Sequence, residues 1–286
     1  IVSRGCSNVA AAGDVCDPAL AAAPPTSDAT AVVRVVVKSR SALAAGPSAA
    51  LTTGTATTAS GNLNIVNTHA PSNGITIHAG TTVQLGSGTN PYTLPGTPPR
   101  ASVLDNDSTL ADLTLASEDQ FFARFFGQTL NDYRRVGGGT RIISGCSPQA
   151  CGQQIMDLID TGERGMQFYV DGDVQFRNSD VSGSTTGSIG TSTNPVIVVA
   201  SGAMDMQGSF TAHGIFYSAT PTATTVANPG GGTTTIFGAY ISRGAFQKTG
   251  SGTFNIVYTP FLWGTGNPNN RLVRVPGTWR DKLTDY

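Results

Sequence analysis

The carboxylates of Asp171-Gly172-Asp173 are the first residues of this chain whose types and spacing could support catalysis. Two acids separated by one residue lie on the same side of a continuous strand, and Asp205 could join them from a neighbouring coil. Carboxylates grouped on a sheet in this way can cleave glycosidic bonds. Asp-Gly is also a favoured turn sequence, and no basic or aromatic residues gather around these acids. The sequence therefore favours a turn between coils, and it predicts no catalytic residue and no enzyme activity.

A second acidic group contains Asp105, Asn106, Asp107 and Asp112. Oxygen-rich side chains at such spacing could bind calcium, but the segment lacks the glycine and the bidentate glutamate of an EF-hand loop. The favoured interpretation is that Asp107 or the following Ser108 makes a turn or begins a helix.

The three histidines, His69, His78 and His213, are scattered along the chain, and no Ser-His-Asp order is legible. His213 lies in a glycine-rich strand, which favours a core or surface histidine. The sequence predicts no metal ion and no other cofactor, and a metal near Asp105 or Asp171 stays an open alternative.

Four cysteines form two local pairs, Cys6 with Cys16 and Cys146 with Cys151. Neither pair has the C-x-x-C spacing of a zinc site. An even number of cysteines favours an oxidising compartment, and of the three possible pairings the local one is predicted.

The composition is poor in charge, since charged residues make up 12% of the chain and the net charge is −1. Without a basic stripe, a nucleic-acid partner is not expected. No apolar run reaches the length of a transmembrane helix. The chain begins at Ile1 without a methionine, so we expect a trimmed or processed product whose preceding segment could include an anchor.

The β architecture is organised around residues 166–258, where glycines recur at intervals of six and alternating apolar and polar triplets lie between them. Such short strands between regular turns are typical of a coiled β-solenoid, in which each coil buries its apolar face on its neighbours. We therefore predict a mainly β fold, a right-handed β-helix with an inserted pair of helices; a β-sandwich or jelly roll is the alternative. The predicted corner glycines are Gly202, Gly208, Gly214, Gly238, Gly244 and Gly250.

One domain, residues 1–286, is predicted, and its segments follow in chain order. They are N-terminal strands and a loop (1–60), first coils (61–116), a helical excursion (117–165), the main solenoid (166–258) and a C-terminal cap around Trp279 (259–286). Individual strands are expected near residues 1–4, 31–38, 62–66, 75–79, 83–85, 140–144, 195–200 and 271–275. The four prolines of residues 90–100 predict a loop there.

The clearest helix is predicted over residues 117–136, with Ser117 as N-cap and Gln120 completing a capping box. Its phenylalanines share one face, which we expect to cover an open end or side of the sheet. Gly127 weakens its middle and could divide it. A second helix is expected from Ser147 and Pro148 to Gly162.

Several phrases along the chain carry a family resemblance: VSRGCS, GNLNIVN, NGITIHAG, CSPQACGQQIMDLIDTGERGMQFYVDGDV, NPVIVVASGAMDMQGSFTAHGIFYS and RVPGTWRD. Together they resemble the PilX-type type IV pilus assembly proteins of betaproteobacteria. These are minor-pilin-like proteins with an N-terminal membrane helix and a β-rich periplasmic or extracellular domain. The chain departs from that pattern because the leader and the apolar N-terminal helix are missing, so it could meet the membrane only through a helix that is absent here.

The resemblance implies a non-enzymatic pilus component that acts in pilus assembly or priming and in surface adhesion. Other pilins, pilus-tip proteins and a host or abiotic surface would be its partners. A secreted β-helix that binds or cleaves polysaccharide is the alternative function. Grouped carboxylates beside a groove would favour this alternative over the pilus component.

Overall fold

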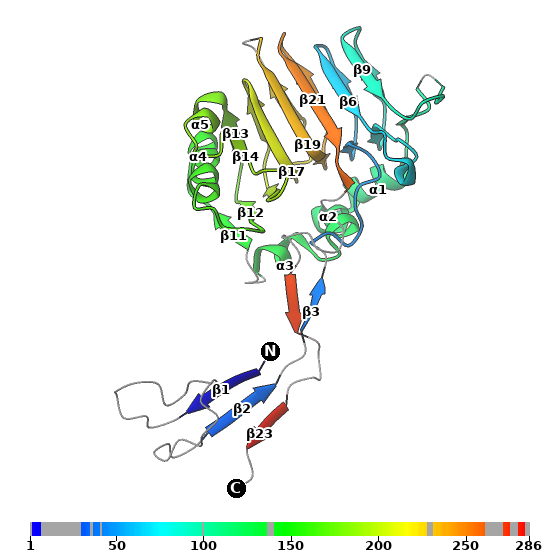
Figure 1. Ribbon diagram of the computed structural model, residues 1–286. Helices are drawn as coiled ribbons and strands as arrows, with labels where there is room; N and C mark the ends of the chain where they lie inside the picture. Colours follow the sequence, from blue (N-terminus) through cyan, green and yellow to red (C-terminus); the bar gives the residue numbers. More distant parts are fainter. Residues whose placement is uncertain are drawn as a thin grey trace. The chain divides into compact units, whose positions relative to one another are not determined.

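The computed structural model describes residues 2–6, 30–34, 37–40, 42–98, 100–135, 140–227, 231–260, 271–274 and 280–283. It is mainly β, with 37% strand against 21% helix, and its larger sheets consist of parallel strands (Figure 1). The mainly β class predicted from the sequence is confirmed.

The contacts of the chain divide it into two compact units: unit 1 comprises residues 1–40 and 271–286, and unit 2 comprises residues 41–270. Unit 2 is therefore an insertion between the two parts of unit 1. One domain was predicted for the whole chain, and that the two units fold together stays a prediction.

Unit 1 is built from antiparallel strands. β1 (Val2–Cys6) pairs with β2 (Thr30–Arg34), β2 pairs with β23 (Arg280–Leu283), and β3 (Val37–Arg40) pairs with β22 (Arg271–Arg274). The single strand expected near residues 31–38 is thus two strands. Cys16 and Trp279 lie outside the described residues, so the Cys6–Cys16 bridge and the cap at Trp279 stay predictions.

Unit 2 contains a first strand set, whose members all run parallel in the order β10-β7-β4-β19-β17-β15-β12-β11. Their bounds are β4 (Leu51–Thr53), β7 (Ile77–Ala79), β10 (Val103–Leu104), β11 (Thr140–Ile143), β12 (Gln167–Val170), β15 (Val196–Ala200), β17 (Phe210–Ser218) and β19 (Thr233–Ser242).

Two further strand sets of unit 2 are also parallel. The second strand set comprises β5 (Thr57–Ala59), β8 (Val83–Leu85), β13 (Val174–Arg177), β16 (Met204–Gln207), β18 (Thr224–Ala227) and β20 (Phe246–Thr249). The third strand set joins the first halves of β17 and β19 to β14 (Ser188–Ile189), β21 (Thr253–Tyr258), β6 (Leu63–Val66) and β9 (Thr89–Tyr92). Figure 1 shows β17, β19, β21, β6 and β9 side by side in this order.

Paired strands recur at regular distances along the sequence. Val103 pairs with Ile77 and Ile77 with Leu51, so partners lie 26 residues apart (103 − 77 and 77 − 51). Later in the chain the distance varies, and Thr233 pairs with Thr253 at 20 residues (253 − 233).

Late strands meet early strands in the middle of the first set, where Tyr240 of β19 pairs with Leu51 of β4. The order of strands in space therefore differs from their order in the chain. The outermost early strand is β10 and the outermost late strand is β11, and the helices α1 to α3 connect them.

The central strands of the first set are buried on both faces, as β15 shows. On β15 all residues are buried: Val198 faces a core that all three strand sets enclose, whereas Ile197 and Val199 face a second cluster. The strand predicted near residues 195–200 is therefore present, and it is buried on both sides.

The second cluster lies beneath α2, whose phenylalanines pack on this face of the sheet. The ring of Phe122 stacks on Phe126 at 4.0 Å and meets Tyr217 of β17 edge-on at 5.0 Å between centroids. The expectation that the aromatic helix face covers a side of the sheet is confirmed.

Ser117 and Ser147 begin helices as predicted, because the hydroxyl of each accepts a hydrogen bond from the main-chain N–H three residues on. The helix expected over residues 117–136 is divided at Gly127, which has a left-handed φ of 65°. The second helix ends earlier than predicted, at Ile159. A helix beginning at Ser108 was one of the two interpretations of the acidic segment, and α1 begins there, whereas α5 and the short 3-10 helix were not predicted. The helices are α1 (Ser108–Ala116), α2 (Glu118–Phe126), α3 (Leu130–Arg135), α4 (Pro148–Ile159), α5 (Asn178–Ser182) and η1 (Ala70–Ser72).

The loop predicted over residues 90–100 is wrong in part, because β9 continues through Pro91 to Tyr92. Among the described strands β9 pairs with β6 alone, so it is an edge strand there. A proline lacks the N–H that a central strand needs, and an edge strand tolerates this loss.

The glycines at six-residue spacing divide into two groups. Gly214 and Gly238 lie inside β17 and β19, opposite each other, at φ values of 155° and 147°. At this point β17 changes its pairing partner from β14 to β15. The other four occupy turns between strands: Gly202, Gly208, Gly244 and Gly250.

Candidate functional site

The three carboxylates that the sequence analysis considered for catalysis are engaged in separate structural contacts. Asp171 pairs with Arg134 at 3.0 Å, and Asp173 accepts a hydrogen bond from the main-chain N–H of Ala203 at 2.7 Å. Asp205 accepts from two glutamine amides of the second strand set, at 3.0 and 2.5 Å. Asp171 and Asp173 flank a turn between β12 and β13, as the favoured interpretation predicts. Each of the three acids thus has its own structural partner.

The acidic segment before α1 acts as a helix start. Asp107 is the N-cap of α1, and its Oδ1 accepts hydrogen bonds from the main-chain N–H groups of Thr109 at 2.9 Å and Leu110 at 3.3 Å. Asp105 lies 3.7 Å from Arg100. Across the described ranges no group of three His, Cys, Asp or Glu side chains could hold a metal ion.

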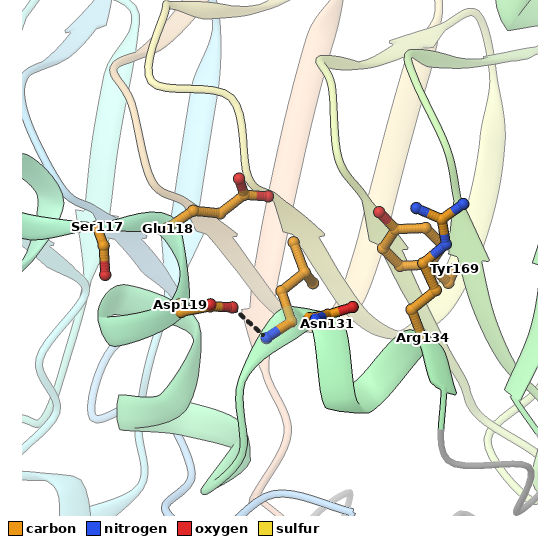
Figure 2. Close-up of a pocket in the computed structure, with 7 residues that line it drawn as sticks. Ser117, Glu118, Asp119, Asn131, Arg134 and Tyr169 are labelled. Carbon is orange, nitrogen blue, oxygen red and sulfur yellow. Dashed lines mark hydrogen bonds between the residues drawn. The ribbon is translucent and has the colours of Figure 1, made fainter.

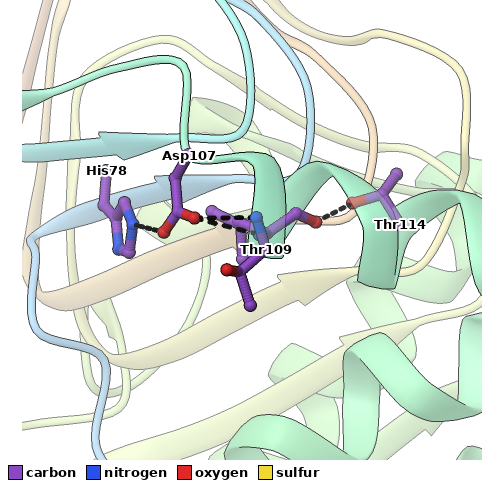
Figure 3. Close-up of polar contacts among 5 residues, drawn as sticks. His78, Asp107, Thr109 and Thr114 are labelled. Atoms are coloured by element: carbon purple, nitrogen blue, oxygen red, sulfur yellow. Dashed lines mark hydrogen bonds and ion pairs between the residues drawn. The ribbon is translucent and has the colours of Figure 1, made fainter.

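Asp107 also holds His78, which lies on β7 (Figure 3). Its Oδ2 is 2.6 Å from Nε2 of the imidazole. Burial disfavours the charge on Asp107, but the hydrogen bonds from His78 and from the first turn of α1 outweigh burial and lower the pKa of the carboxyl. Nothing in the sequence indicates this contact, because 29 residues separate His78 from Asp107.

The disulfide between Cys146 and Cys151 is present, with an S–S distance of 2.03 Å, and it joins the segment before α4 to the first turn of this helix. The predicted local pairing is confirmed for these two cysteines. Within the part of the chain that the structure describes, no helix is long and apolar enough to cross a membrane.

A polar pocket of about 320 Å³ lies between α2, α3 and β12 (Figure 2). Glu118 and Asp119 line it from the first turn of α2, and Asp119 accepts a hydrogen bond from the N–H of Leu130 at 2.8 Å. Burial raises the pKa of Glu118, against the opposing effect of Arg243. Across the pocket, Arg134 lies 5.5 Å from the centre of the Tyr169 ring.

A second pocket, of about 330 Å³, lies over the outer side of β4 and β7. His78, Thr52 and Phe125 form its buried floor and wall, and Arg124 and Ser48 lie at its exposed mouth. We refer to it as the His78 pocket.

The outer side of the third strand set carries two parallel rows of side chains, which we call the ladder face. Alternate residues of these strands are buried in the core, so the remaining ones face outward. Its polar row is Ser188, Thr211, Thr235, Asn255, Asn64 and Asn90, and its apolar row is His213, Phe237, Val257, Val66 and Tyr92.

The amides of the polar row are hydrogen-bonded in one direction. Asn90 donates to Asn64 at 3.1 Å, Asn64 donates to Asn255 at 2.8 Å, and Asn255 donates to the hydroxyl of Thr235 at 2.9 Å. Each amide keeps a second N–H and a second acceptor site on its oxygen for an external partner. Neighbouring side chains repeat at the strand spacing of about 4.8 Å.

The apolar row runs beside the amides. His213 and Phe237 stack at 5.0 Å between ring centres, and Tyr92 ends the row with 54% of its surface exposed. Burial lowers the pKa of His213 from 6.5, so this imidazole is neutral at pH 7. The ladder face therefore bears no charge in either row.

The second strand set offers a different outer surface. Its outward row is also polar but includes charged residues. Asp205 accepts a hydrogen bond from Gln175, and Gln175 accepts one from Arg177. This row provides a comparison surface of similar geometry.

No protein-family profile matches the chain, and neither a curated protein nor a solved structure matches it significantly.

Proposed function

We propose that unit 2 is a right-handed β-helix. Three sets of parallel strands enclose one core, and consecutive paired strands recur every 18 to 30 residues (214 − 196 and 197 − 167). Parallel strands joined through other elements connect almost always in the right-handed sense. A sandwich or jelly roll is built from antiparallel strands, so the parallel pairing of unit 2 argues against that alternative.

We further propose that the chain is a non-enzymatic, minor-pilin-like component of a type IV pilus that attaches to surfaces. The pilus assignment depends on the phrases given above. An oxidising periplasmic or extracellular location agrees with the Cys146–Cys151 bridge. Since unit 2 enters and leaves through unit 1, unit 1 can join it to other pilins or pilus-tip proteins.

The ladder face is the observation that carries the adhesive function. Soluble domains usually carry charge over about a quarter to a third of their surface, whereas this face has none. Its partner is therefore an uncharged, hydroxyl-rich polymer. Outward amides and hydroxyls exchange hydrogen bonds with its hydroxyl groups, and the apolar row packs on its C–H surfaces. The engagement of Asp171, Asp173 and Asp205 argues against cleavage of such a polymer.

Binding to insoluble polysaccharides tests the adhesive part. The full chain should sediment with cellulose or chitin particles and not with anionic cellulose phosphate particles. Asn64→Lys and Asn255→Lys place a charge in the polar row and should weaken sedimentation by about tenfold or more, a loss of at least about 1.4 kcal/mol. Thr58→Lys, on the outer side of the second strand set, is the matched control and should bind normally. Equal loss in all three variants, or no loss in any, contradicts the proposal.

Location tests the pilus part. Pili sheared from cells that produce this chain should carry it, as detected by an antibody to unit 2. Its presence in the medium but not on sheared pili would contradict the pilus assignment while leaving the ladder face untouched.

A further inference from the structure

We propose that the His78 pocket binds a small hydroxycarboxylate, such as a uronic acid, through Arg124 at its mouth and through Thr52 and His78 on its floor. This inference does not depend on the pilus assignment or on the ladder face, because the pocket lies on the outer side of a different strand set.

Two neighbouring strands bring the floor residues together. Thr52 of β4 lies opposite His78 of β7 in the parallel register, about one strand spacing of 4.8 Å apart. Leu51 and Ile77, which precede them, face the core that the strand sets enclose. Thr52 and His78 therefore project from the opposite side of the sheet, into the pocket.

The imidazole of His78 is held in a fixed orientation. Nε2 is 2.6 Å from Oδ2 of Asp107, whose other oxygen caps α1 (Figure 3). Nδ1 has no hydrogen-bond partner among the described residues, so this atom is available to a ligand hydroxyl. The Asp107 carboxylate cannot rotate away from His78 without losing the hydrogen bonds by which its Oδ1 caps α1.

Thr52 supplies the observation that points to a ligand. Its side chain is 1% exposed, yet its hydroxyl has no hydrogen-bond partner among the described residues. A buried hydroxyl without a partner destabilises the fold, and a valine of the same shape would avoid this cost. A second hydroxyl group in the pocket would form the missing hydrogen bond with Thr52, and we assign this group to the ligand.

Charge selects a monoanion. Arg124 is exposed at the mouth and forms no ion pair with any described residue, so one positive charge is uncompensated there. The carboxylate of Asp107 lies beside the floor and disfavours a second negative charge on the ligand. A guanidinium binds a carboxylate through two parallel hydrogen bonds.

Size and polarity favour an organic ligand over an inorganic ion. The volume of about 330 Å³ lies at the lower end of the range for small-molecule sites. The ring of Phe125 contributes an apolar wall. A sugar-sized carboxylate fills this space, with its acid group at the mouth and a hydroxyl on the floor.

Calorimetric titration of the full chain with four probes tests the assignment. Glucuronate should bind, whereas glucose, which lacks the carboxylate, and acetate, which lacks the hydroxyls, should bind at least about tenfold more weakly. Inorganic phosphate should bind no better than acetate. Glucose binding as tightly as glucuronate, phosphate binding most tightly, or no probe binding would each overturn the proposal.

Two variants separate binding from folding. Arg124→Gln should weaken glucuronate binding by about tenfold or more, and Arg135→Gln, on the exposed last turn of α3, is the matched control and should not. Thr52→Val should weaken it about threefold to tenfold while the free chain unfolds at an equal or higher urea concentration. A Thr52→Val chain that is less stable and binds normally would make the hydroxyl a structural group and overturn its assigned role.

Discussion

Replacing Gly214 with alanine tests the packing of neighbouring strands in unit 2. Gly214 lies inside β17, opposite Val196 of β15 and Gly238 of β19, at a φ of 155°. A Cβ at this position would lie 2.0 Å from the carbonyl oxygen of Val196, and main-chain atoms cannot rotate away as a flexible side chain would.

The expected cost has two parts. Holding a residue other than glycine at this φ costs about 1–3 kcal/mol. Forcing a methyl group into a filled space costs a further ~1–3 kcal/mol, because β15 and β17 must move apart. The free energy of unfolding of Gly214→Ala should therefore fall by about 2–6 kcal/mol in total.

Gly162 provides the control, because it has a left-handed φ of 75° and nothing within 4 Å of an added Cβ. Gly162→Ala should cost only the backbone term, about 1–2 kcal/mol. Urea unfolding followed by far-UV circular dichroism measures both, and unchanged slopes show that the comparison is valid. Equal costs for the two variants would refute the argument that the carbonyl of Val196 excludes a side chain.

Three further predictions concern the interior and the disulfide. Tyr217→Phe should raise the free energy of unfolding by about 1 kcal/mol, because it removes a buried hydroxyl with no partner among the described residues. Tyr240→Phe should lower the free energy of unfolding by about 1 kcal/mol, because the hydroxyl of Tyr240 donates to a main-chain carbonyl of β16 at 3.1 Å. Shifts of the same sign in urea unfolding would contradict this reasoning. Replacing both Cys146 and Cys151 with alanine should cost about 2 kcal/mol, since the bridge closes a short loop, and reductant should then have no additional effect on unfolding. Burial lowers the pKa of Lys248 from 10.5, so the unfolded chain binds this proton more tightly than the folded chain does. The free energy of unfolding should therefore rise as pH increases from the lowered pKa toward 10.5. Melting temperatures up to about pH 9.5, before tyrosines of the unfolded chain ionise, should show this rise in the natural chain and not in Lys248→Met.

Local signals in the sequence predicted local structure well. Ser117 and Ser147 begin helices because a hydroxyl bonds to main-chain N–H groups within the same turn, which requires no distant residue. The strand around Ile197 follows from a continuous apolar run, and the strand around Ile256 follows from the alternation of apolar and polar residues. Both signals are local because each strand buries its own side chains.

The extent of α1 beyond its start and the existence of β9 were missed, because their local signals are weak. In α1 only Leu110 and Thr114 are buried, so no apolar stripe marks this helix. β9 contains Pro91, which ordinarily argues against a strand and is tolerated here because one edge is open. Both depend on neighbours that the local sequence does not reveal.

The ladder face had a signal that could have been found. The phrase Leu-Asn-Ile-Val of β6 recurs as Phe-Asn-Ile-Val in β21, and the two strands pair residue for residue. A repeated phrase with a polar residue between buried ones indicates stacked amides on one face. The His78 pocket had no such signal, because Thr52, His78, Asp107 and Arg124 lie far apart in the chain and meet only through strand pairing and helix docking.

The connection between β10 and β11 explains why the surfaces of unit 2 differ. Because the early strands begin in the middle of the first strand set and continue to one end, the chain must return to the other end before the late strands can form. The helices α1 to α3 make this return and cover the outer side of the first set, so that side is apolar, with Ile197, Ile215 and Tyr217 beneath the phenylalanines. The same return brings the start of α1 to His78 and the last turn of α2 to the mouth of the pocket. No helix of the described residues covers the third set, and its outward residues are uncharged amides, hydroxyls and apolar side chains. An uncovered face without charge is unusual for a surface that only contacts water, and this contrast is the physical reason to regard it as a binding surface.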